Sequence, residues 1–287
     1  MIGVLLGLFL FAMTRNLELT RGDSSGAPPP LGRLILLGVG SFLLASAGIV
    51  HAIEERLILA VIGVSFLIVI ARWDSRAAQP LLPKQSFQIR SSLGVLLMVC
   101  FFMSLSEMSY TVYGALILQT VYGFTPLEAG YGLVIFAIGW TVAEVISAHA
   151  PQRLAPHFLI LGPLLLILGM GLIALTVGRA SPIYVVLGGF IMGNAMGVVW
   201  PHLTSLALQK GGRDDDAIIA GAVPTLQRVG FALGAALAGV LANSAGLSQG
   251  LNAETMVSAA RWTHVGMMLP MVFIVIVLIR KWASLRP

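Results

Sequence analysis

Charged residues are scarce in this sequence, and cysteine is almost absent. Charged side chains make up 10% of the 287 residues and hydrophobic ones 57%, whereas soluble domains carry about 25% charged residues. The chain therefore lacks the polar surface that would cover it in water, and we expect an integral membrane protein. With a single cysteine, Cys100, we expect neither a disulfide framework nor a cysteine metal cluster.

Signals for nucleic acid binding and for enzyme chemistry are also missing. The net charge is +5, but the basic residues stand singly between apolar runs, without a basic stripe or interleaved aromatic residues. The five histidines form no cluster, and no HExxH, nucleophile triad or phosphate-binding glycine loop is present. We therefore expect no enzyme activity, no cofactor, no metal site and no nucleic acid partner.

Long apolar runs dominate the rest of the chain. A bilayer core of about 30 Å needs about 20 residues of helix, and eight segments meet this requirement. Backbone groups in lipid must hydrogen-bond internally, and no alternating barrel pattern is visible. The predicted fold class is therefore all-α, a polytopic membrane helix bundle in a lipid bilayer. Its predicted spans are 31–52, 55–72, 93–121, 127–149, 157–178, 182–208, 217–245 and 262–281.

Lysine and arginine predict the orientation of these spans, because cytoplasmic loops are rich in both. If the loop 73–92 is cytoplasmic, only Arg56, Arg179 and Arg261 lie on the other side, and Arg228 lies within a helix. We expect a plasma (inner) membrane protein with a cytoplasmic C-terminus. The cytoplasmic side would hold Arg15, Arg21, Arg33, Arg72, Arg76, Lys84, Arg90, Arg153, Lys210, Arg213, Arg280, Lys281 and Arg286.

The first residues do not fit a complete span. Segment 1–13, MIGVLLGLFLFAM, is apolar but too short to cross. A signal peptide is the alternative, although a basic n-region and a small-residue cleavage site are missing. We expect the tail of a truncated transmembrane helix, followed by a cytoplasmic linker 14–30, a two-helix hairpin 31–72, a cytoplasmic loop 73–92 and six spans in 93–287.

Three stretches carry a resemblance to the fourteen-helix drug:proton antiporter branch of the major facilitator superfamily. They are QPLLPKQSFQIRSS (79–92), LQTVYGFTPLEAG (118–130) and TLQRVGFALGAALAG (225–239). The second is close to that family's "LQxVxGxSPLEAG" outer loop and is the most specific. The third departs from the family's Arg-Gln order, because Gln227 precedes Arg228 here.

The resemblance implies that the chain is the C-terminal six-helix half of such a transporter, preceded by its two-helix insertion. Such proteins export amphipathic small molecules or drugs in exchange for protons. The N-terminal half would be missing, so that half or a second copy of this chain would be needed for a complete pathway. In the loop resembling the family's gating motif, Arg153 matches an arginine, but Gln152 replaces an aspartate.

Glu107 is the leading candidate for proton coupling, since it lies midway along the span 93–121. An ionisable side chain there costs at least about 2–3 kcal/mol and usually faces a bundle interior or a wet cavity. At 100° per residue, Ser104, Tyr110, Thr111 and Gly114 lie within about 60° of it. This polar stripe predicts a helix that lines a pathway, with Ser104, Tyr110 and Thr111 facing the cavity. The alternative is a protonated glutamic acid that bonds to a neighbouring helix.

Glu144 is the second candidate for proton coupling and lies nearer the cytoplasmic end of its span, with Trp140 one turn before it. It could form a cytoplasmic gate or proton site, or pair helices and reach the headgroups. Trp140 is a further cavity candidate. Arg228 could close an inner gate by pairing with Glu144 or with a partner in the missing half, or its charge could reach the membrane surface.

Two glycine series predict close helix contacts, because glycines four residues apart leave a groove. One is Gly189, Gly193 and Gly197; the other is Gly230 and Gly234. Asn194, beside the first series, is either a packing amide or a substrate contact. The sequence thus predicts part of a secondary active transporter for small molecules, with a truncated, non-transporting membrane protein or scaffold as the alternative.

Overall fold

The computed structural model describes residues 31–47, 50, 53–76, 83, 86, 88–211 and 216–285. Within these ranges the regular structure is helical and contains no strand. The predicted segments 1–13 and 14–30, much of the loop 73–92, and the loop residues 212–215 lie outside the described residues. Predictions for those segments therefore stay predictions.

In the described part of the chain, six helices are long and apolar enough to cross a membrane. This confirms the all-α polytopic membrane bundle and the six spans predicted between 93 and 281. Their bounds are α4 (Ser92–Tyr122), α5 (Pro126–Ala148), α6 (Ala155–Thr176), α7 (Ile183–Gly211), α8 (Asp216–Ser244) and α9 (Ala253–Arg280). Short helical turns η1 (Gln152–Leu154), η3 (Leu247–Gln249) and α10 (Trp282–Leu285) join or extend them.

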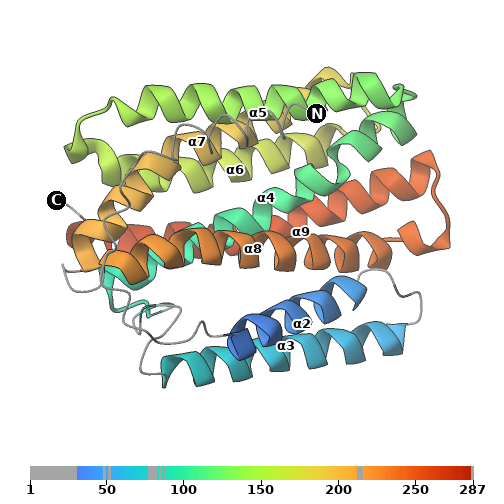
Figure 1. The fold of residues 1–287 in the computed structure, drawn as a ribbon. Coiled ribbons are helices and arrows are strands. Elements are labelled where there is room, and N and C mark those ends of the chain that lie inside the picture. Colours follow the sequence, from blue (N-terminus) through green and yellow to red (C-terminus); the bar gives the residue numbers. More distant parts are fainter. Residues whose placement is uncertain are drawn as a thin grey trace, which may run out of the picture. The chain divides into compact units, whose positions relative to one another are not determined.

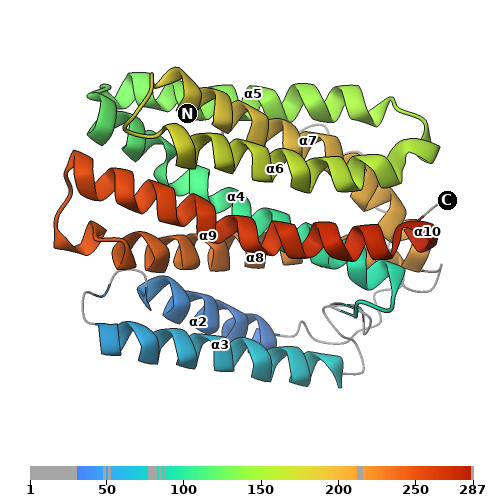
Figure 2. The same cartoon turned by 180° about the vertical axis from the view of Figure 1, so that it is seen from behind.

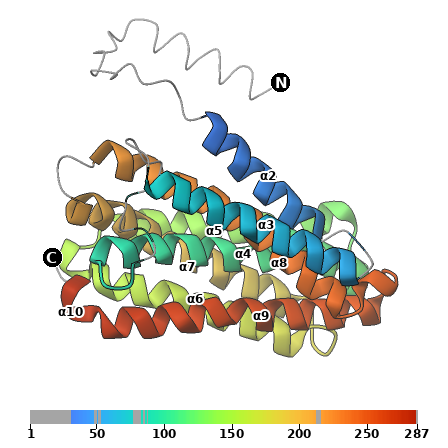
Figure 3. The same cartoon turned by 90° about the horizontal axis from the view of Figure 1, so that it is seen from below.

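Two further helices precede the bundle, α2 (Leu31–Ala47) and α3 (Ile53–Ser75). They run antiparallel (Figures 1 and 2) and at an angle to each other (Figure 3). An ion pair between Arg33 of α2 and Asp74 of α3 joins them at one end. With 17 residues, α2 is shorter than the predicted span 31–52, so a bilayer crossing by this hairpin stays a prediction.

The six long helices pack as two groups of three. In one group α7 contacts both α5 and α6; in the other α4 contacts both α8 and α9. Contacts of α6 with α9 and of α4 with α7 join the groups. Figures 1 and 2 show α4 passing between the first group and the helices α8 and α9.

This central position explains why α4 is buried and its neighbours are not. The share of the apolar window that is buried is 83% in α4 but 28% in α5. Large apolar side chains are exposed on α5 and α6, among them Ile138, Val145, Leu168 and Leu175. In water such a surface would be a large apolar patch, whereas in a bilayer it suits the lipid chains.

Local sequence signals set the ends of these helices. Gly123 ends α4 with a φ of 72°, and Thr125 begins α5 through a capping box with Glu128. The helix that holds the predicted span 262–281 starts earlier than that span, because α9 begins at Ala253. Asn252 caps it and forms a second capping box with Thr255. The helix start at Ala253 thus lies nine residues before the apolar run on which the prediction rested.

Candidate functional site

Glu107 lies near the middle of α4, the helix that contacts every other member of the bundle. Only 3% of its surface is exposed. The Thr111 hydroxyl, one turn further along α4, donates a hydrogen bond of 3.2 Å to Glu107 Oε1. Glu107 Oε2 is buried and has no hydrogen-bond partner in the described residues. A buried oxygen without a partner carries a desolvation cost, which a proton or a water molecule would relieve.

Around Glu107, the other predicted members of the polar stripe face different neighbours. The Tyr110 ring is fully buried, and its hydroxyl donates to the Gly132 carbonyl of α5 at 3.2 Å. A Cβ at Gly189 would meet the Tyr110 ring, so Tyr110 also packs against α7. Ser104 faces Gly230 of α8, and its hydroxyl is buried without a partner in the described part. Of the predicted stripe, Thr111 is the residue that bonds to Glu107.

Aromatic side chains connect α4, α5 and α7 in a continuous row. The ring centroids of Tyr110 and Phe136 are 5.7 Å apart, those of Phe136 and Trp140 6.1 Å, and those of Trp140 and Trp200 6.3 Å. Such separations are typical of aromatic pairs. The row leads from the middle of α4 to Glu144, because the Trp140 indole Nε1 donates to Glu144 Oε2 at 3.0 Å.

Arg228 and Glu144 form no ion pair in the described part of the chain, so this alternative for Arg228 has no support there. Arg228 is exposed on α8, and its guanidinium lies 6.0 Å from the Phe231 ring centre, within the same helix. Among the described residues, the ion pair formed is that of Arg33 with Asp74. Glu144 accepts from an indole instead, because Trp140 stands one turn before it on the same helix face.

The glycine series bring helix backbones into contact. A Cβ at Gly193 would meet the Phe136 carbonyl, and one at Gly197 would meet the Trp140 carbonyl, so this series lies in the α5–α7 interface. A Cβ at Gly230 or Gly234 would meet carbonyls of α4. This arrangement supports the packing interpretation.

Two further predicted site residues lie apart from Glu107. The Asn194 amide donates to the Phe190 carbonyl of its own helix at 2.8 Å and lies beside Gly139 of α5. Arg153 is exposed in η1. Neither residue is close enough to bond Glu107.

Two histidines show features that sequence reasoning missed. His264 of α9 is fully buried; its Nδ1 lies 2.7 Å from the Ala260 carbonyl, while Nε2 has no partner in the described residues. His202 stacks on Phe158 with the ring centroids 4.7 Å apart. Their burial depends on helix contacts, which no local sequence pattern reveals. In the described part of the chain, no three His, Cys, Asp or Glu residues come together to hold a metal.

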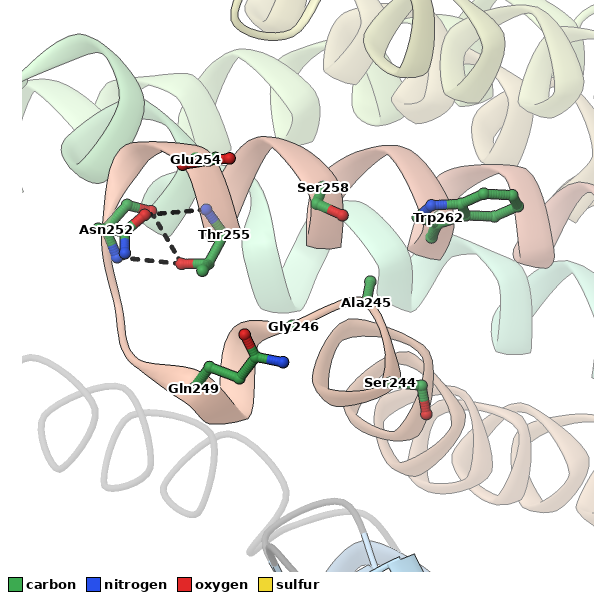
Figure 4. Close-up of a pocket in the computed structure, with 9 residues that line it drawn as sticks. All are labelled: Ser244, Ala245, Gly246, Gln249, Asn252, Glu254, Thr255, Ser258 and Trp262. Atoms are coloured by element: carbon green, nitrogen blue, oxygen red, sulfur yellow. Dashed lines mark hydrogen bonds between the residues drawn. The ribbon is translucent and has the colours of Figure 1, made fainter.

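An open hollow of about 600 Å³ lies between the end of α8 and the start of α9. Figure 4 shows that Asn252 and Thr255, two of its polar residues, are bonded to each other in the α9 capping box. Their hydrogen-bonding groups therefore serve the helix start. The wide opening and these occupied groups distinguish the hollow from an enclosed ligand site.

Comparison with known proteins finds relatives whose names refer to drug efflux or drug resistance. The chain is 29% identical, over 226 residues, to a protein of Mycobacterium tuberculosis named "Probable multidrug-efflux transporter" in two strains; the match covers 75% of this chain and 47% of that protein. It is 27% identical over 185 residues to the methylenomycin A resistance protein of Streptomyces coelicolor, covering 64% of this chain and 38% of that protein. No family model matches the chain. The chain thus spans about half the length of the Mycobacterium tuberculosis relative and less than half that of the Streptomyces coelicolor relative.

Proposed function

We propose that this chain is part of a secondary active transporter that exports small drug-like molecules across a membrane. Two observations support the proposal. The described helices form a multi-pass bundle, and the relatives named above are a multidrug-efflux transporter and a drug resistance protein.

Within this proposal, the bundle α4–α9 is one six-helix half of a major facilitator fold of the fourteen-helix branch, and α2 with α3 is its insertion hairpin. Transporters of this type have two halves that rock around a site near the membrane midplane. A second half would come from the part of the relatives that this chain does not match, or from a second copy. The positive-inside distribution of Lys and Arg supports a cytoplasmic C-terminus in the cell's plasma membrane.

Our proposal of proton coupling is based on Glu107. Its carboxyl group lies buried at mid-span, with one oxygen bonded by Thr111 and the other without a partner among the residues that the structure describes. Such a group can take up a proton in one state of the bundle and release it in another, when a second partner or water reaches Oε2. Intramembrane carboxyls are the usual carriers in proton relays.

Transport in inside-out vesicles tests the role of Glu107. The native protein is expressed, a pH gradient is imposed, and uptake of a fluorescent drug is recorded before and after nigericin collapses the gradient. We expect gradient-driven uptake by the native protein and none by Glu107→Gln at equal expression. Glu254→Gln, at the exposed start of α9, is the matched carboxyl control and should transport normally.

Two outcomes would contradict different parts of the proposal. Undiminished gradient-driven uptake by Glu107→Gln would remove Glu107 as the proton carrier. Native uptake that survives nigericin would remove proton coupling and leave export intact. No uptake by the native protein under any gradient would instead favour the alternative of a non-transporting membrane scaffold.

A further inference from the structure

Residues 281–285, which we call the terminal strap, contact three helices at one end of the bundle. They continue α9 through the four-residue helix α10, which lies at that end in Figure 2. A helix of this length is not stable by itself. Leu285 is nevertheless buried, with 1% of its surface exposed. Its burial indicates that contacts with the rest of the bundle hold the strap in place.

Two hydrogen bonds join the strap to the start of α4. The hydroxyl of Ser92, the first residue of α4, donates to the Ser284 carbonyl at 3.2 Å. The Lys281 ammonium donates to the Arg90 carbonyl at 3.3 Å. Carbonyls at the end of a helix lack a partner within it, and Ser92 supplies one to Ser284. Since α4 and α9 belong to the same group of three helices, these two bonds stay within that group.

A third contact of the strap reaches the other group. The Trp282 ring meets the ring of His157, near the start of α6, with the centroids 4.8 Å apart and the planes inclined by 83°. This edge-to-face arrangement is favourable for aromatic rings. Because α6 packs with α7 and α5 in the other group, the strap connects both groups at this end.

Contacts of a different kind join α6 to α9 at the opposite end. Arg261 Nε of α9 donates to the Ala174 carbonyl of α6 at 3.3 Å. Gly178, just after α6, lies so close to Val257 of α9 that an added Cβ would meet the Val257 side chain. Both contacts involve backbone of α6 or of the turn after it. The contact of Trp282 with the α6 histidine joins two side chains, which can separate by rotating, so α6 can leave α9 more easily at the strap.

We propose that the terminal strap holds α6 against α4 and α9 at this end of the bundle and releases α6 when the end opens. The release rests on the proposed export function, whereas the holding does not. The distribution of Lys and Arg predicts that this end faces the cytoplasm, so the strap would act at the inner opening. Its release would separate α6 from the start of the helix that carries Glu107.

Thiol labelling tests whether the strap is held. In a Cys100→Ala background, N-ethylmaleimide is added to vesicles that contain the full chain with Leu285→Cys. We expect slow labelling, and about two- to tenfold faster labelling after Trp282→Ala, as for the loss of an aromatic pair. Trp282→Phe keeps a ring and should label slowly. Trp262→Ala is the matched control, because this tryptophan is 59% exposed nearer the other end of α9, and should leave the rate unchanged.

Reversible cross-linking tests whether the strap must open. A short bifunctional methanethiosulfonate reagent bridges His157→Cys and Trp282→Cys, and dithiothreitol removes the bridge. The control pair is Gln152→Cys with Ser205→Cys, at the same end but within one group, where the Gln152 amide donates to the Ser205 hydroxyl at 3.1 Å. We expect gradient-driven drug uptake in inside-out vesicles to stop in the bridged first pair and to return with dithiothreitol. Uptake should continue in the bridged control pair.

The other results separate the strap from the export proposal. Equal labelling rates of Leu285→Cys with Trp282→Ala and with Trp262→Ala would overturn the strap. Continued uptake by the bridged first pair would overturn its release, as would equal arrest of both pairs. Absence of uptake before any bridging would count against export and therefore against the release, while the labelling would still decide whether the strap holds α6.

Discussion

The Thr111 hydroxyl donates to Glu107 Oε1 at 3.2 Å, from one turn further along the same helix. Because both residues belong to α4, this bond does not depend on a residue of a neighbouring helix. The other oxygen, Oε2, lies buried without a partner in the described residues. Any change in the surroundings of Glu107 therefore acts on Oε2, while Thr111 fixes the direction of the carboxyl group.

Replacing Thr111 with valine should destabilise the protein. The variant keeps the side-chain shape and removes the donor, so neither oxygen of Glu107 would be bonded within the described residues. We expect the free energy of unfolding to fall by about 1 kcal/mol, the net value of a typical hydrogen bond, measured by thermal unfolding in detergent. Thr225→Val is the control, because Thr225 bonds to a carbonyl of its own helix in an exposed position. Equal stabilities of the two variants would contradict the importance of the Thr111 bond.

Alanine at Gly193 or Gly234 should disrupt helix pairs. An added methyl group would meet the carbonyl of Phe136 in the first case and of Leu105 in the second, and overpacking of this kind costs about 1–3 kcal/mol. Gly221→Ala is the matched control within α8, because its Cβ would meet nothing within 4 Å. We expect the first two variants to lose yield and thermal stability in detergent while the control does not. A Gly193→Ala protein as stable as the control would show that α5 and α7 can separate.

The ion pair of Arg33 and Asp74 should tie α2 to α3. The exposed fractions of the two side chains are 13% and 8%, and breaking a fully buried ion pair by removing one partner costs about 3–5 kcal/mol. Asp74→Asn and Arg33→Gln should each make the hairpin sensitive to limited proteolysis. In a double-mutant cycle the two effects should not add. Full additivity would mean that the pair contributes nothing as a pair.

Cysteine labelling should reveal the orientation of the bundle. Gln209 and Gln249 are exposed at opposite ends of the helical hairpins, at the end of α7 and in η3. In a Cys100→Ala background, which removes the buried native thiol, an impermeant maleimide added to intact cells should label Gln249→Cys and spare Gln209→Cys. The reverse labelling pattern would invert the proposed topology.

The positions of helices could be predicted from the sequence where the length of an apolar run and the capping residues at its ends indicate the same helix. The predicted span 127–149 corresponds to α5, whose start combines Thr125, Pro126 and Glu128 in a capping box. For α9, hydropathy marks the apolar run from 262 onward, whereas the helix begins nine residues earlier, after the cap at Asn252. Hydropathy reports which residues prefer lipid, whereas a helix also continues beyond the lipid as long as its backbone is bonded.

Relationships between side chains were harder to predict than helices. Helical geometry placed Tyr110 on the Glu107 face, but a bulky ring can turn toward α5 and find the Gly132 carbonyl. The same geometry placed Trp140 beside Glu144, where a hydrogen bond is indeed formed. Contacts within one helix follow from spacing, whereas contacts between helices depend on packing angles that a single sequence does not give.

The glycine contacts limit how this bundle can move. Gly193 and Gly197 press α7 against the α5 backbone, and Gly234 presses α8 against α4. If α7 slid along α5, or α8 along α4, by one turn, larger side chains would meet backbone carbonyls. We therefore expect the two helices of each pair to move together. The two groups meet through contacts of α6 with α9 and of α4 with α7, so any movement of one group against the other would take place along those contacts, and the second lies on the helix that carries Glu107.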